Sequence, residues 1–315
     1  MNYDFIHPTS VRSFGRSRTG RCTSAVRSLS WNQTLKPLIP SLCLVLLVVY
    51  GLADKLRNFV IGIFIPQYHY HYPVVLCFGQ VLVSLLVLNL LHFLGLVPLK
   101  RYSRSLGEKL LLPAICSSIQ DVMVMWLKAS SLYSGVFLLA LPLLPLVTVA
   151  LSFALKTASP PSVHLSVMTA ILSGTSVVIT ASRGFSHTEP LEYAYAPLAL
   201  LLHGLSLTCL GKVSDAESRR PPEAQASAFD VYYTSLVNQG LVLGLLWLLH
   251  PDSLRRVLSR GSWNSLLFNG YLHAILLLGT LLSFLIGMSA LCVSPFAAAV
   301  LHSAKQVLEP FFLLL

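Results

Sequence analysis

The chain has 315 residues, of which 55% are apolar and only 11% are charged, roughly half the charged fraction of an ordinary soluble domain. The net charge of +10 does not indicate nucleic-acid binding, because the basic residues gather in the N-terminal tail and at the ends of apolar blocks. This composition excludes a typical soluble domain and predicts an all-α polytopic membrane protein.

The N-terminal tail, residues 1–37, is polar and basic, with Arg and Lys side chains opposed by a single acid, Asp4. No apolar core follows an early charge, so the tail is not a secretory signal peptide. An Arg- and Ser-rich segment is also compatible with an organelle transit peptide. We predict a disordered cytosolic tail, because the same charges serve as an orientation signal.

Nine apolar blocks follow the tail, most of them close to the roughly 20 residues that a membrane-spanning helix needs. They cover residues 38–65, 73–97, 110–128, 133–155, 163–182, 192–211, 229–249, 265–291 and 295–315. Backbone groups in lipid must satisfy their own hydrogen bonds, so each block is predicted to be a helix. The nine helices would form one transmembrane domain over residues 38–315.

The distribution of Lys and Arg predicts that the N-terminus is cytosolic. Fourteen of these residues lie in segments that would then be cytosolic, and five lie on the opposite side, as the positive-inside rule requires. The loop 250–264 opposes this orientation, because three of the five fall there. The balance still favours a cytosolic N-terminus and places the end of a nine-helix chain on the luminal side.

The first block contains "GLADKLRNF", with Asp54, Lys55 and Arg57 near its middle. Either Asp54 offsets one base while the other reaches an interface, or the charges contact a substrate. The next loop, "YHYHYP" (68–73), contains His-x-His but no further ligands, so an interfacial aromatic loop is favoured over a metal site. The six cysteines form no CxxC pair, and we expect neither a metal nor a cofactor.

A faint internal repeat links the two halves of the chain. "ASSLYSGVF" (129–137) aligns with "MSALCVSPF" (288–296), and each copy ends one block and opens the next. Transporters are often built from such repeats. We therefore predict a first half over about 38–182 and a second half over about 192–315.

The seventh block opens with "FDVYYTSLVNQG" (229–240). Tyr232 and Tyr233 could belong to an interfacial aromatic belt, or could offer rings and hydroxyls to a base or a sugar. Asn238 and Gln239 are amides inside an apolar run and need hydrogen-bond partners. No nucleotide-binding loop, dinucleotide fingerprint or metalloprotease motif occurs, so the chain is not expected to be an enzyme.

The ninth block carries Lys305 at its centre and Glu309 one turn later. The two could form a local pair on one helical face. A lysine in a bilayer costs roughly 2.5–3.5 kcal/mol on insertion scales, so we favour a cavity-facing side chain. The small residues around it leave room for close helix contacts or for a substrate. A positive charge in a wet cavity suits an anionic substrate such as a phosphate.

The stretch "SPFAAAVLHSAKQVL" (294–308) resembles the ninth helix of nucleotide-sugar transporters, the solute carrier 35 branch of the drug/metabolite transporter superfamily, UDP-sugar and GDP-sugar carriers among them. Three other stretches are similar to that family: "HYPVVLCFGQ" (71–80) to the junction into helix two, "LGKVSD" (210–215) to the end of helix six, and "DVYYTS" (230–235) to a Phe/Tyr-Tyr-Asn motif. The resemblance extends from about residue 40 to the end.

The resemblance implies a fold of two inverted five-helix halves and exchange of a cytosolic nucleotide sugar for a luminal nucleoside monophosphate across a Golgi or endoplasmic reticulum membrane. Lys305 would contact the phosphates or the ribose. Tyr232, Tyr233 and Thr234 would line the base or sugar site, and we add Asn238 and Lys55 to the expected substrate contacts. The partners would be the nucleotide sugar and membrane lipid, with no nucleic acid.

The sequence also departs from the family pattern. Thr234 replaces the motif's Asn, His302 replaces a Gly, and the basic pair of helix four would fall at Leu139 and Ala140. A tenth helix is missing, so we expect a truncated form that is less stable or less active, or that depends on a homodimer to cover the ninth helix. The alternatives are a non-transporting membrane scaffold of the same fold and a carrier of another metabolite.

Overall fold

The structure is a computed structural model that describes residues 38–315 apart from 71, 130–134, 158–160, 183–191, 222–224, 250–256, 258, 260 and 313–315. The predicted tail, residues 1–37, lies outside the described residues. The chain divides into two units, Met1–Leu46 and Leu47–Leu315. Helix α2 (Leu38–Tyr68) begins in the first unit, and the contacts below all lie within the second.

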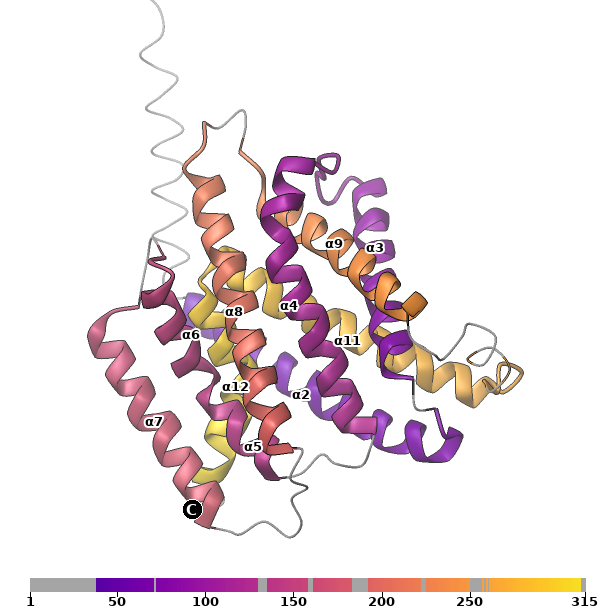
Figure 1. Ribbon diagram of the computed structural model, residues 1–315, viewed down its shortest axis with the longest axis horizontal. Coiled ribbons are helices and arrows are strands. Elements are labelled where there is room, and N and C mark those ends of the chain that lie inside the picture. Colours follow the sequence, from indigo (N-terminus) through magenta and orange to yellow (C-terminus); the bar gives the residue numbers. More distant parts are fainter. Residues whose placement is uncertain are drawn as a thin grey trace, which may run out of the picture. The chain divides into compact units, whose positions relative to one another are not determined.

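All regular secondary structure in the described part of the chain is helical (Figure 1), which confirms the predicted all-α class. After α2 come α3 (Pro73–Phe93), α4 (Arg104–Ala129), α5 (Gly135–Ala140), the 3-10 turn η1 (Leu141–Leu143), α6 (Leu144–Ala154), α7 (Val163–Ser182), α8 (Glu192–Ser218), α9 (Ala228–Leu249), α11 (Leu266–Cys292) and α12 (Pro295–Phe312). Within the described residues each predicted apolar block overlaps one helix, except that 133–155 is divided among α5, η1 and α6.

Six helices are long and apolar enough to cross a membrane on their own: α3, α4, α7, α8, α9 and α11. Shorter apolar stretches lie at Leu141–Ala154 and Pro295–Ala304. Helix α2 carries Asp54, Lys55 and Arg57 in its middle, which lowers its hydropathy. The described helices therefore fit a multi-pass membrane protein, although six of them, rather than the predicted nine, qualify by length and composition.

The outward faces of these helices are strongly apolar. Leu86 of α3 is 69% exposed, Val178 of α7 is 67% exposed and Leu248 of α9 is 84% exposed. Soluble monomers rarely expose contiguous apolar surface on this scale. The same surface is favourable against lipid chains, where the helical backbone needs no external hydrogen bonds.

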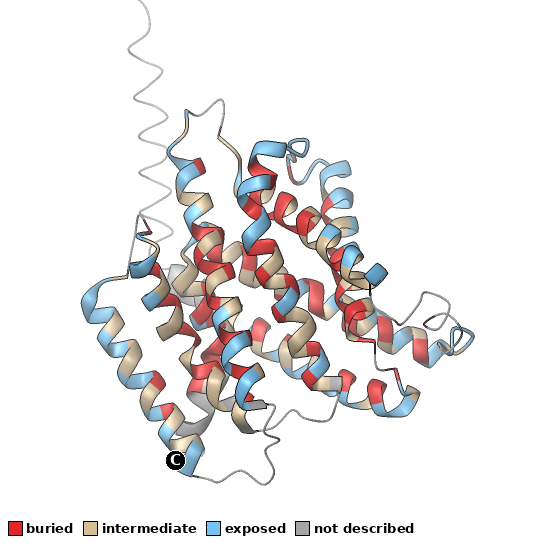
Figure 2. Ribbon diagram, in the orientation of Figure 1, coloured by how far each residue is buried: buried red, intermediate tan, exposed pale blue. Residues whose placement is uncertain are grey.

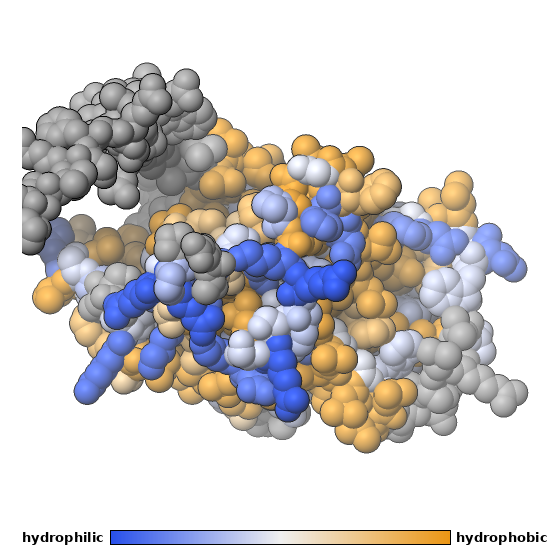
Figure 3. Space-filling view, turned by 90° about the horizontal axis from the view of Figure 1, so that it is seen from above, coloured by the Kyte–Doolittle hydropathy of each residue, from blue (hydrophilic) through white to orange (hydrophobic). Residues whose placement is uncertain are grey.

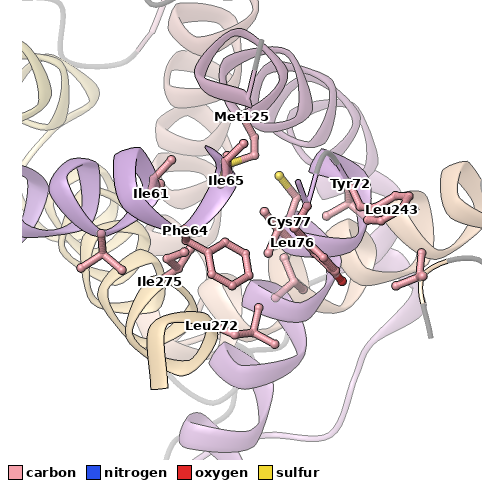
Figure 4. Packing of buried hydrophobic residues seen from close by; sticks show 14 of the residues in the cluster. Ile61, Phe64, Ile65, Tyr72, Leu76, Cys77, Met125, Leu243, Leu272 and Ile275 are labelled. Carbon is pink, nitrogen blue, oxygen red and sulfur yellow. The ribbon is translucent and has the colours of Figure 1, made fainter. Parts of the chain in front are cut away.

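Helix α4 is central in the packing, because it lies against α3, α8 and α9 (Figure 1). Buried residues follow the facing sides of these helices, whereas α7 is mostly exposed or half-buried (Figure 2). The largest apolar cluster joins Phe64 of α2, Leu76 of α3 and Leu272 and Ile275 of α11 (Figure 4). The sulfur-bearing side chain of Met125 from α4 and Leu243 of α9 belong to the same cluster, so one core joins five helices.

One end of the bundle, where α4 begins and α8 ends, is polar and tightly connected. Figure 3 looks onto this end and shows hydrophilic residues gathered there with apolar side chains around them. Glu217 is buried and forms two ion pairs. Its Oε1 lies 3.3 Å from Nζ of Lys109, and its Oε2 lies 2.9 Å from Nη1 of Arg220. Asp230 accepts a hydrogen bond of 2.7 Å from the backbone N–H of Lys100. These contacts join the ends of α4 and α8 and the start of α9.

Helix α7 satisfies most of its own polar side chains. The hydroxyls of Thr169, Thr175 and Thr180 each donate to a backbone carbonyl three or four residues earlier. Ser176 instead donates to the carbonyl of Gln306 at 3.1 Å, which attaches α7 to α12. A helix with many hydroxyl side chains can therefore remain largely exposed without unpaired donors at these positions.

Candidate functional site

A polar cavity lies inside the Leu47–Leu315 unit, enclosed by α2, α3, α4, α8, α9, α11 and α12. Its volume, measured as space for the centres of water molecules, is about 130 Å³. One water needs roughly 10–15 Å³ of such space, so the cavity can hold several waters or a small polar group. Its polar lining residues are Tyr50, Asp54, Arg57, Gln80, Ser117, Gln120, Asp121, Lys128, His203, Tyr232, Ser235, Gln239, Ser283 and His302.

The wall formed by α2, α3 and α11 contains a hydrogen-bonded chain. Arg57 donates from Nη2 to Oε1 of Gln80 at 2.7 Å, and Gln80 donates from Nε2 to Oγ of Ser283 at 2.8 Å. Gly279 makes this arrangement possible, because a Cβ at that position would collide with the Gln80 side chain. The Nε of Arg57 is buried and has no hydrogen-bond partner, so the guanidinium keeps an unused donor.

A second chain connects α4 with α2. Lys128 donates from Nζ to Oδ1 of Asn58 at 2.7 Å, and Asn58 donates from Nδ2 to Asp54 at 3.1 Å. Asp121, two turns before Lys128 on α4, lines the same cavity. The cavity wall thus carries the cations Arg57 and Lys128 and the two carboxylates.

Two histidines from different helices lie side by side in the cavity lining. The ring centroids of His203 on α8 and His302 on α12 are 4.8 Å apart. The Nδ1 of His302 shares a hydrogen bond of 2.6 Å with the Tyr50 hydroxyl, and the Nδ1 of His203 lies 3.1 Å from Oε1 of Gln120. The Nε2 of His203 is buried without a partner. No group of three or more metal-binding side chains occurs among the described residues.

Tyr232 lines the cavity, and its hydroxyl is buried and has no hydrogen-bond partner. Its ring packs edge-on against Phe284, with centroids 5.7 Å apart, and lies directly over Gly287, where a Cβ would collide with it. A buried hydroxyl without a partner is unfavourable by roughly 1–3 kcal/mol. Such a group calls for a solvent or ligand partner.

The structure separates the residues that the sequence grouped as substrate contacts. Tyr232 lines the cavity and is also a buried member of the large apolar cluster, whereas Tyr233 packs against that cluster and does not line the cavity. Thr234 donates its hydroxyl to the backbone carbonyl of Asp230 at 2.7 Å. Asn238 is buried and bonded within the protein. The expected roles of these residues in binding stay predictions.

Neither of the two lysines of the expected site is seen to line the cavity. Lys55 is exposed and is absent from the cavity lining, while Asp54 and Arg57 on the same helix line the cavity. Lys305 belongs to helix α12, but its side chain lies outside the described residues. His302, one turn before Lys305, reaches the cavity.

Sequence reasoning assigned no role to Gln80, Asp121, Lys128, His203 or His302. A signal for the first two was present, because "FGQVL" and "IQDVM" each place a strongly polar residue inside an apolar block, and such residues are functional candidates in membranes. Lys128 lies at the end of its apolar block, where a lysine is expected at a membrane surface. His203 and His302 each stand alone in a different block, so no sequence pattern links them. Only the packing of α3, α4, α8 and α12 shows that these side chains converge.

The fold and the cavity together define an all-helical multi-pass membrane protein with an internal polar site. No protein-family model matches the chain, and no curated protein matches it significantly. The function must therefore be argued from the cavity itself.

Proposed function

We propose that the chain is a transmembrane carrier of a small anionic solute, and specifically of a nucleotide sugar exchanged against a nucleoside monophosphate. The observation that supports this most is the convergence of Arg57, Asp121 and His302 on one cavity, each well inside its own helix. Ionisable groups inside membrane helices are costly and mark substrate or ion pathways. The unpaired Nε of Arg57 and the unpaired hydroxyl of Tyr232 supply hydrogen-bond capacity for a ligand.

The lining suggests how the parts of such a ligand would bind. Arg57 and Lys128 would hold phosphate oxygens, since cationic donors form the strongest hydrogen bonds to phosphate. Tyr232 would contact the base or the sugar, and the carboxylate of Asp121 would accept hydrogen bonds from hydroxyl groups of the ligand. A whole drug-sized ligand usually occupies about 300–1,000 Å³, more than the 130 Å³ available. The helices would therefore separate further on binding, as alternating access entails.

In the proposed arrangement, nine helices cross a Golgi or endoplasmic reticulum membrane in two inverted halves, α2–α7 and α8–α12. The polar end of the bundle supports a cytosolic N-terminus. It carries Arg104, Lys109, Arg219 and Arg220, and these residues would face the cytosol in this arrangement, as the positive-inside rule favours.

The proposal is tested by exchange in proteoliposomes. The purified chain is reconstituted into liposomes loaded with nucleoside monophosphates, and uptake of a panel of labelled nucleotide sugars is measured. We expect uptake of at least one sugar above protein-free liposomes, and stimulation by one internal monophosphate. A folded chain that takes up no member of the panel would overturn the proposal.

A second function, a non-transporting scaffold, is favoured by one specific observation. Polar side chains of the cavity lining hydrogen-bond to one another, in the series Arg57–Gln80–Ser283 and Lys128–Asn58–Asp54, as they would in a purely structural core. The variants Arg57→Gln and Lys55→Gln decide between the two functions. A carrier should lose uptake in Arg57→Gln while keeping its fold, and should lose far less in Lys55→Gln. A scaffold should show no uptake and should lose only stability in Arg57→Gln.

A further inference from the structure

We propose that the His203–His302 pair is a proton-binding site coupled to the anion site, so that a proton binds together with each anionic substrate. This inference rests on the proposed function and adds a second ligand, the proton, to the same cavity. It is carried by the arrangement of the two imidazoles and by the charge balance of the wall that they face.

The hydrogen bonds assign the proton acceptor. Oε1 of Gln120 is a carbonyl oxygen and can only accept, so the Nδ1 of His203, 3.1 Å away, carries the hydrogen and donates it. The Nε2 of a neutral ring then holds a lone pair. This Nε2 is buried and has no protein partner. When water reaches it, it can accept a proton from a hydronium ion, which leaves a neutral water and an imidazolium, and it can return the proton to a water later, without any other bond changing.

The second ring limits the pair to a single proton. With centroids 4.8 Å apart, two imidazolium rings would repel each other strongly. His302 shares a hydrogen bond of 2.6 Å with the hydroxyl of Tyr50, which holds its ring in place beside His203. The two imidazoles therefore titrate as one unit.

The pair faces a wall whose described charges cancel. The titratable side chains that line the cavity with it are Tyr50, Asp54 and Arg57 of α2, Cys77 of α3, Asp121 and Lys128 of α4, and Tyr232 of α9. Two cations and two carboxylates sum to zero. The described residues of α5, η1 and α6 add no titratable group, and α7 adds the exposed His164. On α12 itself, the Lys305 side chain lies outside the described residues.

This balance couples the proton to the anion. A proton on the pair gives the described cavity wall a net positive charge, which favours an anionic ligand. The ligand in turn offsets the cost of holding an imidazolium away from bulk water. Linkage makes the effect reciprocal: substrate promotes proton binding to the same extent that the proton promotes substrate binding.

Proton access to the pair follows the access of water to the polar cavity. On their other side, His203 and His302 border a second, much smaller cavity of about 10 Å³. Its other lining residues are Gln120, Phe137, Ala140, Leu141, Leu144, Ala196, Ala199 and Leu200. This volume is at the limit for a single water, and its walls are almost entirely apolar. Protons would therefore enter and leave with the substrate.

The test measures binding of UDP-glucose to the detergent-solubilised full chain between about pH 5 and pH 8. A phosphate monoester titrates near pH 6, but the diester groups of UDP-glucose do not, so any pH dependence belongs to the protein. We expect the dissociation constant to fall as the pH falls, by up to about tenfold per pH unit for one linked proton. In weakly buffered solution, binding should also take up protons, which a pH indicator reports.

Variants locate the proton. His203→Gln and His302→Gln should each flatten the pH dependence and abolish proton uptake, while His273→Gln, which changes an exposed imidazole on α11, should keep both. Thermal unfolding checks that each variant is folded. If one histidine variant does not fold, the slope and proton uptake of the unmodified chain together with the other variant still decide the question.

The outcomes separate this inference from the proposed function. Binding of UDP-glucose with a flat pH profile would overturn the proton site and leave the carrier intact. A slope that persists in the double variant His203→Gln/His302→Gln would move the proton to another group and also overturn it. If neither UDP-glucose nor any other nucleotide sugar of the panel binds at any pH, the carrier proposal fails, and the proton coupling fails with it.

Discussion

Tyr102, in the segment before α4, donates a hydrogen bond of 3.0 Å from its hydroxyl to Oδ1 of Asn238 on α9. The same amide donates from Nδ2 to the backbone carbonyl of Gly107 at 2.8 Å. Both ends of the Asn238 amide are therefore occupied within the protein. Gly107 allows this contact, because a Cβ there would collide with the Tyr102 ring. Asn238 thus joins α9 to the beginning of α4.

We predict that Asn238→Ala lowers the free energy of unfolding by roughly 1–3 kcal/mol, because it removes the hydrogen bond from the carbonyl of the buried Gly107 and the one from the exposed Tyr102. Thermal unfolding in detergent provides the measurement. Asn89→Ala is the matched control, since Asn89 is exposed and donates to the carbonyl of Leu85 on its own helix. Equal effects of the two substitutions would contradict the packing role of Asn238.

Tyr232 and Tyr233 offer a matched comparison between adjacent residues of α9. Removal of a buried hydroxyl that has no partner is close to neutral or stabilising, so we expect Tyr232→Phe to fold at least as well as the unmodified chain. Its substrate affinity should nevertheless fall severalfold, because the ligand loses a hydrogen-bond partner. Tyr233→Phe should change affinity much less. Uptake at several substrate concentrations measures both, and a larger loss in Tyr233→Phe would reverse the assignment.

Glu217 holds the polar end of the bundle together. We expect Glu217→Gln to destabilise the fold by roughly 1–3 kcal/mol, less than the 3–5 kcal/mol of a fully buried pair, because the Lys109 and Arg220 side chains remain 42% and 39% exposed. Glu108→Gln is the control: its pair with Arg104 is exposed, and such pairs contribute about 0–1 kcal/mol. Chemical denaturation measures both, and a larger effect at Glu108 would contradict the prediction.

Two glycines of α11 should respond in opposite directions to the same substitution. At Gly279 an added methyl group would collide with Gln80, so Gly279→Ala should disrupt the Arg57–Gln80–Ser283 chain and destabilise the protein. At Gly270 nothing lies within 4 Å of the added Cβ, so Gly270→Ala should stabilise the helix by roughly 0.5–1 kcal/mol. Melting temperatures of the two variants give the signs, and a stabilised Gly279→Ala would show that Gln80 can move freely.

Much of the fold could be predicted from the sequence, because apolar blocks of spanning length can only be helices in lipid. The block 133–155 differs from the prediction of one helix: Pro142 and Pro145 lack the backbone N–H that a continuous helix needs, and the structure places the 3-10 turn η1 there. Helix α4 begins at Arg104, six residues before the block, because charged turns extend a helix beyond its apolar part.

The cavity could be predicted only in part, because a sequence shows which residues are polar but not which of them meet. Lys55 and Arg57 are two positions apart and therefore face directions about 200° apart on a helix. Both are long cationic side chains, so their chemistry does not distinguish them. Only the packing of α3 and α11 against one face of α2 places Arg57, and not Lys55, at the cavity. The meeting of His203 with His302 similarly depends on two helices separated by about 100 residues of chain.

The hydrogen bonds between the threonine hydroxyls of α7 and the backbone of the same helix have a consequence for membrane insertion. When α7 enters the bilayer, the elements α5, η1 and α6 that contact it have already been synthesised, but α12 has not. Thr169, Thr175 and Thr180 would carry their hydrogen bonds with them, because each acceptor lies on the same helix. Helix α7 would thus insert before α12, which supplies the carbonyl for Ser176, has been synthesised.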